Sequence, residues 1–472
     1  MIGRRALEPD AIPGGLAVPD NRWDLVRDEV EAARARRDVS VAIVIPYFEQ
    51  PRQLAILYAA LERELADARD VEVVVVDDGS VCRPPAPPAT LRASVLRQAD
   101  FGHRAAAARN RGVRSTAADV LVFLDADTIP ASGYLSTIVA WPAVLPDAVV
   151  VGRRRHADLG SLDGDAALRW ARLGTGDPPC TELPGPQWLA DGYAASADLL
   201  HADDRSYRYV ISSVMACRRE LFDDVGGFDD SLREYGGEDW DVAARAFNNG
   251  AVLVHEPRAV AWHDGPDWAG RDGDGRARNG QTVRLAERIT DPRGRGAGVI
   301  HRWPETVVRL RGRHNDDLVI ASVVSVLDAV VDVRVNVDHA GRRATDYFAH
   351  DPRVQVGAIS DDVALRARTQ VELARPAVWR PGALHGALEA VRPGLAGRLT
   401  VTEGEGPVAT VTATRALGRM RRAGRSDDET LARWFGATSQ PAAAAGLEPL
   451  PAEVDLAAFF DRAGCRTQDR AR

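Results

Sequence analysis

Two carboxylates one residue apart, Asp125 and Asp127, directly follow the apolar run 120–124. An apolar run of this length with β-branched residues is typical of a central strand in a parallel sheet. Open α/β sheets bind their ligands at the carboxyl ends of such strands. Carboxylates grouped there attract a hard divalent cation, which in turn accepts phosphate oxygens. The sequence therefore predicts a site for a metal-bound, phosphorylated substrate.

The Asp-x-Asp spacing by itself is not sufficient for this prediction, because it occurs at two further places. Asp163 and Asp165, and likewise Asp272 and Asp274, lie in glycine-rich polar stretches. Such stretches are typical of solvated turns. The strand that precedes Asp125 is what distinguishes this pair from the other two.

The composition is that of an ordinary globular protein of two or three domains, with 472 residues, 45 % of them hydrophobic. The net charge of −8 argues against nucleic acid as the main partner. We find no apolar run long enough for a membrane helix and no signal-peptide pattern before residue 38. The four scattered cysteines predict neither a zinc site nor a disulfide framework. We therefore expect a cytoplasmic enzyme without a transmembrane segment.

The sequence contains no lysine, since all 60 basic residues are arginine. Walker A loops, protein kinases and pyridoxal-phosphate enzymes each require a lysine at a defined position. No Gly-x-Gly-x-x-Gly follows a predicted strand either, so a dinucleotide-binding fold is unsupported. Many classes of phosphate-handling enzyme are thereby excluded.

The order of predicted elements indicates an α/β architecture. Strands at 41–45, 71–76, near 95 and at 119–124 alternate with helices at 54–68 and 104–115. This alternation predicts a parallel sheet with right-handed crossovers. Farther along, we expect a strand at 210–216, a helix at 238–248, two strands at 252–255 and 260–263, and a mobile loop at 265–280. The clearest linker is 291–298.

An ordered set of motifs makes the chain from about residue 39 to 280 resemble a family 2 glycosyltransferase of the GT-A fold. The motifs are Ile45-Pro46-Tyr47, Val76-Asp77-Asp78-Gly79-Ser80, Ala107-Ala108-Arg109-Asn110-Arg111-Gly112, Phe123-Leu124-Asp125-Ala126-Asp127, Gly226-Gly227-Phe228-Asp229 and Gly236-Gly237-Glu238-Asp239. The resemblance implies four regions: an N-terminal helical extension (1–38), a GT-A glycosyltransferase domain (39–290), a smaller α/β domain (299–445) and a C-terminal tail (446–472).

The resemblance implies that the nucleotide of a sugar donor lies against the first two strands. The residues implied to bind it are Pro46, Tyr47, Glu49, Asp78, Arg104 and Asp125. Asp78 would accept the imino hydrogen of a uracil-like base, which makes a UDP-linked donor the first expectation, whereas Asp77 would cap the turn. Arg104 is equally well read as a solvated arginine, and Arg109 is expected to brace the sheet.

The resemblance also implies a metal-dependent, inverting transfer. Asp127 and His263 would bind Mn²⁺ or Mg²⁺, for which imidazole and carboxylate are suitable ligands. Asp239 would be the catalytic base, kept ionised by the start of its helix. Glu238 and Trp240 would contact the acceptor. The acceptor itself is left open between a glycan, a lipid-linked intermediate, a natural product and a peptide.

The C-terminal region repeats parts of the first domain. The segment 371–384 parallels 123–135, and 408–417 parallels 213–221. Ala374 and Pro376 stand where the copy would need its two acids. We therefore expect a degenerate GT-A-like domain without metal or catalysis, used for packing, for pairing of two copies in a homodimer or for acceptor binding.

Two other functions remain open at this point. A sugar nucleotidyltransferase would share the fold, but it needs a basic signature after the first strand, where this chain has Pro46 to Glu49. A non-catalytic scaffold or binding protein with a transferase-like site would be favoured by loss of Asp127, Asp239 or His263, and all three are present.

Overall fold

Two separate sheets organise the part of the chain that the computed structural model describes, which is residues 8–35, 38–66, 70–174, 176–234, 236–266, 275–296 and 298–461. The chain divides into two units. The first unit comprises Met1–Phe247 and Ala251–Leu285, and the second comprises Asn248–Gly250 and Ala286–Arg472. Each unit is described by itself below.

The sheet of the first unit has the strand order β5-β4-β3-β6-β10-β8-β11-β7, with β9 paired to β8. Its strands are β3 (Val41–Tyr47), β4 (Val71–Asp77), β5 (Ala93–Arg97), β6 (Val120–Leu124), β7 (Thr128–Pro130), β8 (Ala148–Ala157), β9 (Glu182–Leu183), β10 (Val214–Arg218) and β11 (Val252–Asp264). The four strands β5, β4, β3 and β6 are parallel, whereas β10 runs antiparallel to both β6 and β8. The predicted α/β sheet is therefore confirmed, in a mixed rather than purely parallel form.

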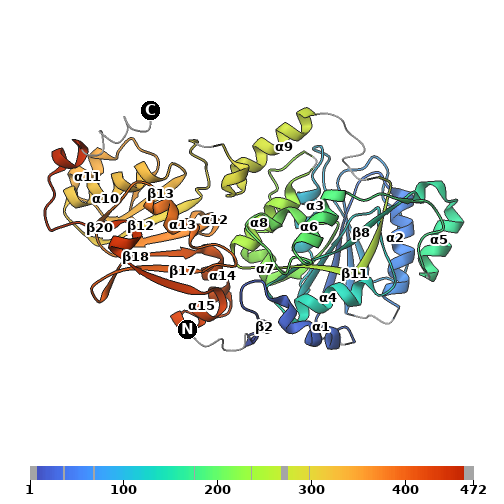
Figure 1. The fold of residues 1–472 in the computed structure, drawn as a ribbon. Coiled ribbons are helices and arrows are strands. Elements are labelled where there is room, and N and C mark those ends of the chain that lie inside the picture. The colour runs from blue at the N-terminus through green and yellow to red at the C-terminus, as the bar shows by residue number, and fades with distance from the viewer. Residues whose placement is uncertain are drawn as a thin grey trace. The chain divides into compact units, whose positions relative to one another are not determined.

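Helices cover both faces of this sheet, and α2 and α3 lie on opposite sides of it (Figure 1). The helices of the unit are α1 (Arg27–Ala33), α2 (Pro51–Glu64), α3 (Ala105–Arg114), α4 (Tyr134–Val144), α5 (Gly164–Leu173), α6 (Gln187–Ala195), α7 (Arg219–Asp224), α8 (Glu238–Asn248) and α9 (Gly275–Arg288), of which the last continues into the second unit. Alanines and Gly112 let α3 lie close to the strands, since a Cβ at Gly112 would come within 2.5 Å of Val44 Cγ1. Packing on both faces explains why these strands are apolar throughout rather than alternating.

The N-terminal extension is less helical than its composition predicts. The region 1–38 was expected to be a helical extension, but its described helical part is a 3-10 turn (Trp23–Val26) followed by α1, which ends at Ala33. Arg36 and Arg37 lie outside the described residues. Before this, β1 (Asp10–Ile12) and β2 (Gly15–Ala17) form an antiparallel hairpin.

The sheet of the second unit has the strand order β14-β13-β12-β15-β18-β17-β19. Its strands are β12 (Thr306–Arg313), β13 (Val333–His339), β14 (Val354–Val356), β15 (Thr369–Leu373), β17 (Arg398–Glu403), β18 (Gly406–Ala413) and β19 (Ala437–Pro441), and a separate pair is formed by β16 (Ala377–Trp379) and β20 (Leu447–Pro449). Strand β12 is parallel to β13 and β15, and β18 is antiparallel to β15 and β17. A second, smaller α/β domain is thus present.

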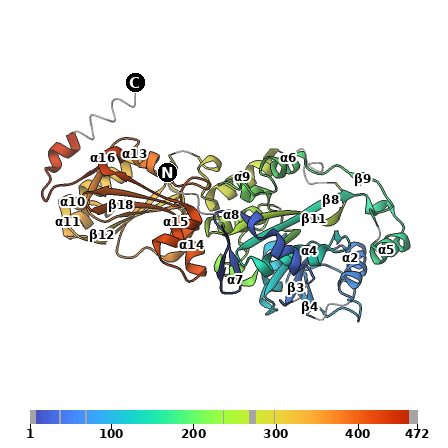
Figure 2. The ribbon, with the colours of Figure 1, turned by 60° about the horizontal axis from the view of Figure 1, so that its bottom comes forward.

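Helices α10, α11 and α13 lie on one side of this sheet and α14 and α15 on the other (Figures 1 and 2). The helices of the unit are α10 (Asp316–Ala329), α11 (Arg342–Tyr347), α12 (Asp361–Arg366), α13 (Ala383–Glu389), α14 (Thr414–Arg422), α15 (Asp428–Phe435) and α16 (Ala442–Ala445). The apolar core lies on the side of α10 and α13, where Val323 and Leu384 pack against strand residues such as Val335. The unit therefore has a core of its own.

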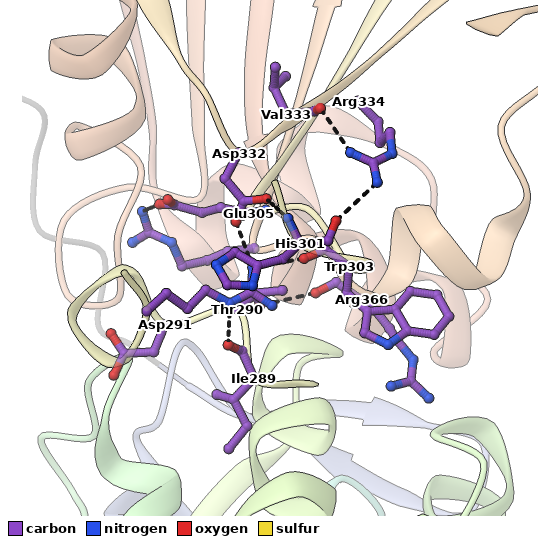
Figure 3. Close-up of polar contacts among 12 residues, drawn as sticks. Ile289, Thr290, Asp291, His301, Trp303, Glu305, Asp332, Val333, Arg334 and Arg366 are labelled. Atoms are coloured by element: carbon purple, nitrogen blue, oxygen red, sulfur yellow. Dashed lines mark hydrogen bonds and ion pairs between the residues drawn. The ribbon is translucent and has the colours of Figure 1, made fainter. Parts of the chain in front are cut away.

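The segment predicted as a linker, 291–298, is tied to the second unit by one buried arginine. Arg295 donates from Nε to the Ile289 carbonyl (2.7 Å) and from Nη1 to the Trp303 carbonyl (2.7 Å) and to Asp332 Oδ2 (2.6 Å) (Figure 3). Its side chain is only 4 % exposed. Because these groups satisfy each other, the described part of the segment is held in place by hydrogen bonds despite its glycine-rich composition.

Three expected boundaries differ from the structure. The two last strands of the first unit are one strand, β11, with an irregularity between Glu256 and Val260. Helix α9 begins inside the stretch 265–280 that was expected to be a mobile loop, of which residues 267–274 lie outside the described part. In the expected tail, Leu447–Pro449 forms β20, because it completes the pair with β16.

Two further expectations concern single features. In the described residues, none of the helices combines the length and the apolarity that crossing a bilayer requires. Of the cysteines, Cys82, Cys180 and Cys217 are free thiols, and Cys465 lies outside the described residues.

Candidate functional site

The Asp-x-Asp pair lies at the carboxyl end of β6, as its sequence context predicts. The chain turns immediately, with the Thr128 amide donating to the Asp125 carbonyl (3.0 Å), and continues as β7. Strand β7 pairs with β11 so that Thr128 is opposite His263. This pairing places His263 Nε2 3.7 Å from Asp127 Oδ2. Two residues far apart in the sequence are thereby brought to one point.

Asp127 is almost enclosed by protein. Its Oδ2 accepts a hydrogen bond from Gln50 Nε2 (2.9 Å), and Gln50 precedes the first residue of α2. Burial raises the pKa of the Asp127 carboxyl, which His263 partly offsets and the nearby Asp125 reinforces. The neighbours of this desolvated carboxylate compensate its negative charge only in part, so the carboxylate is suited to binding a cation.

Asp127 and His263 fit a divalent cation as a partial ligand set. Their facing oxygen and nitrogen are close enough to share one ion, and both ligand types suit Mn²⁺. Among the described residues there is no cluster of three or more His, Cys, Asp or Glu side chains that would hold a metal by itself. The site thus fits an ion that completes its coordination with substrate oxygens and water, as Mg²⁺ and similar ions do at phosphate sites.

Asp125 is joined to the start of α8 by one buried arginine. Arg109, on α3 and 3 % exposed, donates from Nη2 to Asp125 Oδ1 (2.6 Å) and from Nη1 to Glu238 Oε1 (3.1 Å). The two carboxylates raise the pKa of this guanidinium in spite of its burial, so the arginine stays charged. Arg109 was expected to brace the sheet. Its bridge from Asp125 to Glu238 was not predicted, because the bridge depends on where α8 begins.

Asp239 lies in the first turn of α8, next to Glu238. Its Oδ1 accepts a hydrogen bond from the Trp240 amide (2.9 Å). Burial, followed by the negative charge of Glu238, raises the pKa of the Asp239 carboxyl to about 7, against the opposing influence of Arg109 and Arg154. Desolvation thus opposes the helix start, which was expected to keep Asp239 ionised, and the role of Asp239 as the base stays a prediction.

The conformation of the backbone, rather than a close approach to a ligand, explains the glycines at positions 236 and 237. Both have a positive φ, 87° and 100°. A Cβ at Gly236 would lie 2.7 Å from Gln281 Nε2, and one at Gly237 3.0 Å from Leu285 Cδ2. The two glycines are needed because the chain must turn tightly under α9 before α8 starts.

The residues expected at the nucleotide lie along the ends of β3 and β4. Pro46 and Tyr47 end β3, where Tyr47 is buried and Pro46 half-buried. Glu49 has a φ of 51°, accepts a hydrogen bond at its side chain from the Val81 amide, and donates its own amide to Ser80 Oγ (3.1 Å). Glu49 therefore fastens the turn after β3 to the turn after β4.

Asp78 and Arg104 are linked to each other by the backbone. Asp78 Oδ2 accepts from the Arg104 amide (2.8 Å) and Oδ1 from Gln98 Nε2 (2.6 Å), whereas the Arg104 guanidinium lies over the Phe101 ring at 5.6 Å. Asp77 Oδ1 accepts from the Ser80 amide (2.9 Å), which is the turn-capping contact expected of it. Each oxygen of Asp78 keeps a lone pair for a base, so its role in base recognition stays a prediction.

Trp240 belongs to a group of aromatic side chains next to Asp239. The Trp188 ring lies 6.2 Å from Trp240 and 6.3 Å from Tyr209, and the Tyr207 ring lies 6.3 Å from Trp240. Trp188 is 42 % exposed. Trp188 and Tyr207 are thereby brought beside Trp240, in the first turn of α8.

Two polar residues of the site were not found from the sequence. Gln50 contacts Asp127, and Arg154, on β8, lowers the pKa of Asp239 by its charge. The only feature of the sequence that marks Gln50 is its place before Pro51, because proline is typical of the first position of a helix. Nothing in the local pattern of β8 marks Arg154.

Part of the chain matches a known family. Residues 42–226 match the family model described as "Glycosyl transferase family 2". A chondroitin synthase of Pasteurella multocida (strain Pm70) is 25 % identical over 53 % of this chain and 27 % of its own length. A pre-mycofactocin glycosyltransferase of Mycobacterium tuberculosis is 29 % identical over 51 % of this chain and 49 % of its own length.

Among solved structures, a mannosyltransferase from Pyrobaculum calidifontis in complex with GDP-Man and Mn²⁺ covers 60 % of this chain and 66 % of its own, with 17 % identity and a TM-score of 0.35. A likeness this low carries no weight for ligands. The chain spans between about a quarter and a half of the length of the two curated relatives. The family match and the mixed α/β sheet agree with the GT-A fold that the motifs imply.

Proposed function

Because residues 42–226 form a family 2 glycosyltransferase domain, we propose that this chain transfers a sugar from a nucleoside-diphosphate sugar to an acceptor, with inversion at the anomeric carbon. The observation that carries this proposal is the connected row of charges at the site. Asp127 faces His263, Asp125 is bridged to Glu238 by Arg109, and Asp239 follows Glu238. The row offers a cation site and a base on neighbouring elements.

Asp127 and His263 are the side chains that would hold a divalent cation, Mn²⁺ or Mg²⁺. When bound, such an ion neutralises charge on the departing nucleoside diphosphate. Asp125 would face the ribose while Arg109 fixes its direction. Pro46, Tyr47, Glu49, Asp78 and Arg104 lie where the base would be held, and a uridine nucleotide is the first donor to test.

Asp239 is the group that would take a proton from the acceptor as it attacks the anomeric carbon. A pKa near 7 suits this task, because the carboxylate is available at neutral pH and still basic enough to accept a proton. Glu238 is held by Arg109 and would bind acceptor hydroxyls, with Trp240 forming a wall of the acceptor site. The transfer is a single displacement, so no covalent sugar–enzyme bond is formed.

The test is release of nucleoside diphosphate from UDP-glucose, UDP-N-acetylglucosamine and GDP-mannose, with and without Mn²⁺. We expect turnover of one donor that needs Mn²⁺ and falls by about 100-fold or more in Asp127→Ala and His263→Ala, because charge stabilisation is lost. Asp165→Ala is the matched control, since it removes an exposed acid from another Asp-x-Asp pair. If no donor binds with Mn²⁺ by calorimetry, the proposal is wrong.

We further propose that the second unit is a degenerate copy of the first. Its strand order and the direction of each pairing repeat those of the first sheet, with β12 to β15 and β17 to β19 in the places of β3 to β6, β8, β10 and β11. Gly133 and Gly382 precede α4 and α13 with φ values of 78° and 76°. Ala374 and Pro376 follow β15 where Asp125 and Asp127 follow β6, which supports a copy without a metal site.

A further inference from the structure

The repeated topology allows the two sheets to be compared position by position. Gly382 follows Glu372 at the same interval at which Gly133 follows Phe123. In the first sheet Phe123 is paired with Val44, and in the second Glu372 is paired with Arg309. The pairings continue in the same register into β4 and β13, β10 and β18, and β8 and β17, so the residues of these strands can be matched one by one.

The first unit uses one face of its sheet for packing alone. On this face Val44 and Val76 lie against Gly112 of α3, and Phe123 packs on Phe222 of α7. Seven residues of this face, each at most 4 % exposed, are Val44, Val74, Leu121, Phe123, Val149, Met215 and Cys217. All of them are apolar, as a covered face requires.

The second unit has a polar residue at every one of these seven positions. In the same order the counterparts are Arg309, Asn336, Gln370, Glu372, Arg398, Thr410 and Thr412. The helix in the place of α3 is α12, which has 6 residues where α3 has 10. A shorter helix leaves less of the face covered beside Arg309 and Asn336, the counterparts of Val44 and Val74. Val149, Met215 and Cys217 line a small cavity with residues of α7 and α8 in the first unit, so their counterparts lie farther along the same face.

The uncovered face is a groove of about 410 Å³, and all seven polar residues line it. Helix α12 contributes Asp361 and Ala364 to the wall, and α14 contributes Leu417. The residues at the bottom of the groove are buried, since Asn336 is 1 % and Thr412 5 % exposed. The volume is that of a small-ligand site, large enough for one or two sugar rings.

The charges in the groove are paired within the wall itself. Arg309 Nε lies 2.7 Å from Asp338 Oδ1 and Arg311 Nε 2.9 Å from Glu372 Oε2, and Arg398 donates to Asp428. These pairs leave little charge to attract an ion. Amide and hydroxyl groups from Asn336 and Thr410 are both donors and acceptors, which suits a ligand with many hydroxyl groups and no charge.

We propose that this groove binds a neutral oligosaccharide, either the acceptor or the growing product of the transferase site. The proposal rests on the proposed function for the choice of ligand, because a sugar chain is what the first unit would extend. Asp361 is exposed at the rim and disfavours anionic sugars there. The second copy would then have exchanged donor binding and catalysis for recognition of the carbohydrate.

The experiment measures saccharide binding to the full chain by saturation-transfer NMR and calorimetry. The probes are maltotetraose, cellotetraose and tetra-N-acetylchitotetraose, with a hyaluronan tetrasaccharide as the charged comparison. Thr410→Tyr fills the groove, and Thr412→Val removes one hydroxyl without changing the side-chain shape. Thr345→Tyr, on an exposed position of α11, is the matched control for the added ring.

We expect at least one neutral tetrasaccharide to bind, with affinity at least about tenfold weaker in Thr410→Tyr and about three- to tenfold weaker in Thr412→Val, as loss of a hydrogen bond implies. Thr345→Tyr should bind as the wild type does. Nucleoside diphosphate release from the donor should be unchanged in all three variants. The proposal is overturned if none of the neutral probes binds, or if Thr410→Tyr binds as tightly as Thr345→Tyr. If the wild type releases no nucleoside diphosphate from any donor, that result contradicts the proposed function alone.

Discussion

At the scale of single residues, Asp239 shows how the surroundings raise the pKa of a carboxyl group. It stands between Glu238, which disfavours its ionisation, and Arg109 and Arg154, which favour it. Enclosure by the protein has the largest influence and raises the pKa to about 7. The two neighbouring acids therefore differ, since burial raises the pKa of Asp239 while Glu238 is paired with Arg109.

The elevated pKa predicts how activity depends on pH. A base must be deprotonated to act, so its competent form is lost as the pH falls below about 7. We expect kcat/KM to rise with pH through about 7 and then to level off. Asp239→Asn should lower kcat by about 100- to 10,000-fold while donor binding persists, and Glu220→Gln, at an exposed acid of α7, should not. A profile that is flat from pH 5 to 9 would contradict the assignment.

At the scale of elements, α3 carries the residue that connects β6 to α8. Arg109 connects the end of β6 to the start of α8, so that the Asp-x-Asp pair and the first turn of α8, which contains Asp239, keep a common position. The guanidinium forms both contacts at once because its donors point along different directions. A lysine has a single point charge and cannot bridge both carboxylates.

Arg109→Lys therefore tests whether this bridge positions the site. We expect a loss of stability of about 1.5–3 kcal/mol, the usual cost of a lost hydrogen bond to a charged group, and a fall in kcat larger than any change in KM for the donor. Thermal unfolding and donor kinetics measure the two effects. Arg111→Lys on the exposed face of the same helix is the control. Equal behaviour of the two variants would show that the bridge has no positioning role.

The contact between α3 and the sheet gives a second prediction at this scale. Gly112→Ala places a Cβ 2.5 Å from Val44 Cγ1, so the helix must shift. We expect it to cost about 1–3 kcal/mol, as overpacking does. Gly386→Ala, in α13 with no atom within 4 Å of the new Cβ, should instead be neutral or stabilise by up to about 1 kcal/mol. Urea denaturation of both variants measures the difference.

At the scale of the whole molecule, the chain has two sheets of the same topology and a separate core for each. The copy that keeps apolar residues on both faces of its sheet also keeps the acids. The second unit has Ala374 and Pro376 after β15, a polar groove on one face of its sheet and the short helix α12.

Separate cores predict separate unfolding transitions. Leu54→Ala in α2 and Leu384→Ala in α13 each remove a fully buried side chain, at a cost of about 2–5 kcal/mol. We expect calorimetry to resolve two transitions, with each variant lowering a different one. A nucleotide with Mn²⁺ should raise only the transition that Leu54→Ala lowers, because ligands stabilise the unit that binds them. A single transition that both variants lower equally would contradict this prediction.

The sequence by itself determined the features that depend on neighbouring residues. The strand that ends at Asp125, the helix that begins at Glu238 and the missing acids at Ala374 and Pro376 were all readable, because apolar runs, turns and helix starts are local patterns. The errors in the elements lay at their boundaries, as in the continuous strand β11 and the early start of α9, and in the direction of β10, which makes the sheet mixed.

Only the tertiary structure decided which residues far apart in the sequence come into contact and how far they are buried from solvent. The pairing of β7 with β11 places His263 at Asp127, and Gln50 and Arg154 reach the site from elements whose patterns do not mark them. The pKa of Asp239 depends on burial, which no spacing encodes. The polar groove of the second unit became visible only when the register of both sheets was known, since alternate residues of a strand share a face and a shift by one residue would exchange the faces.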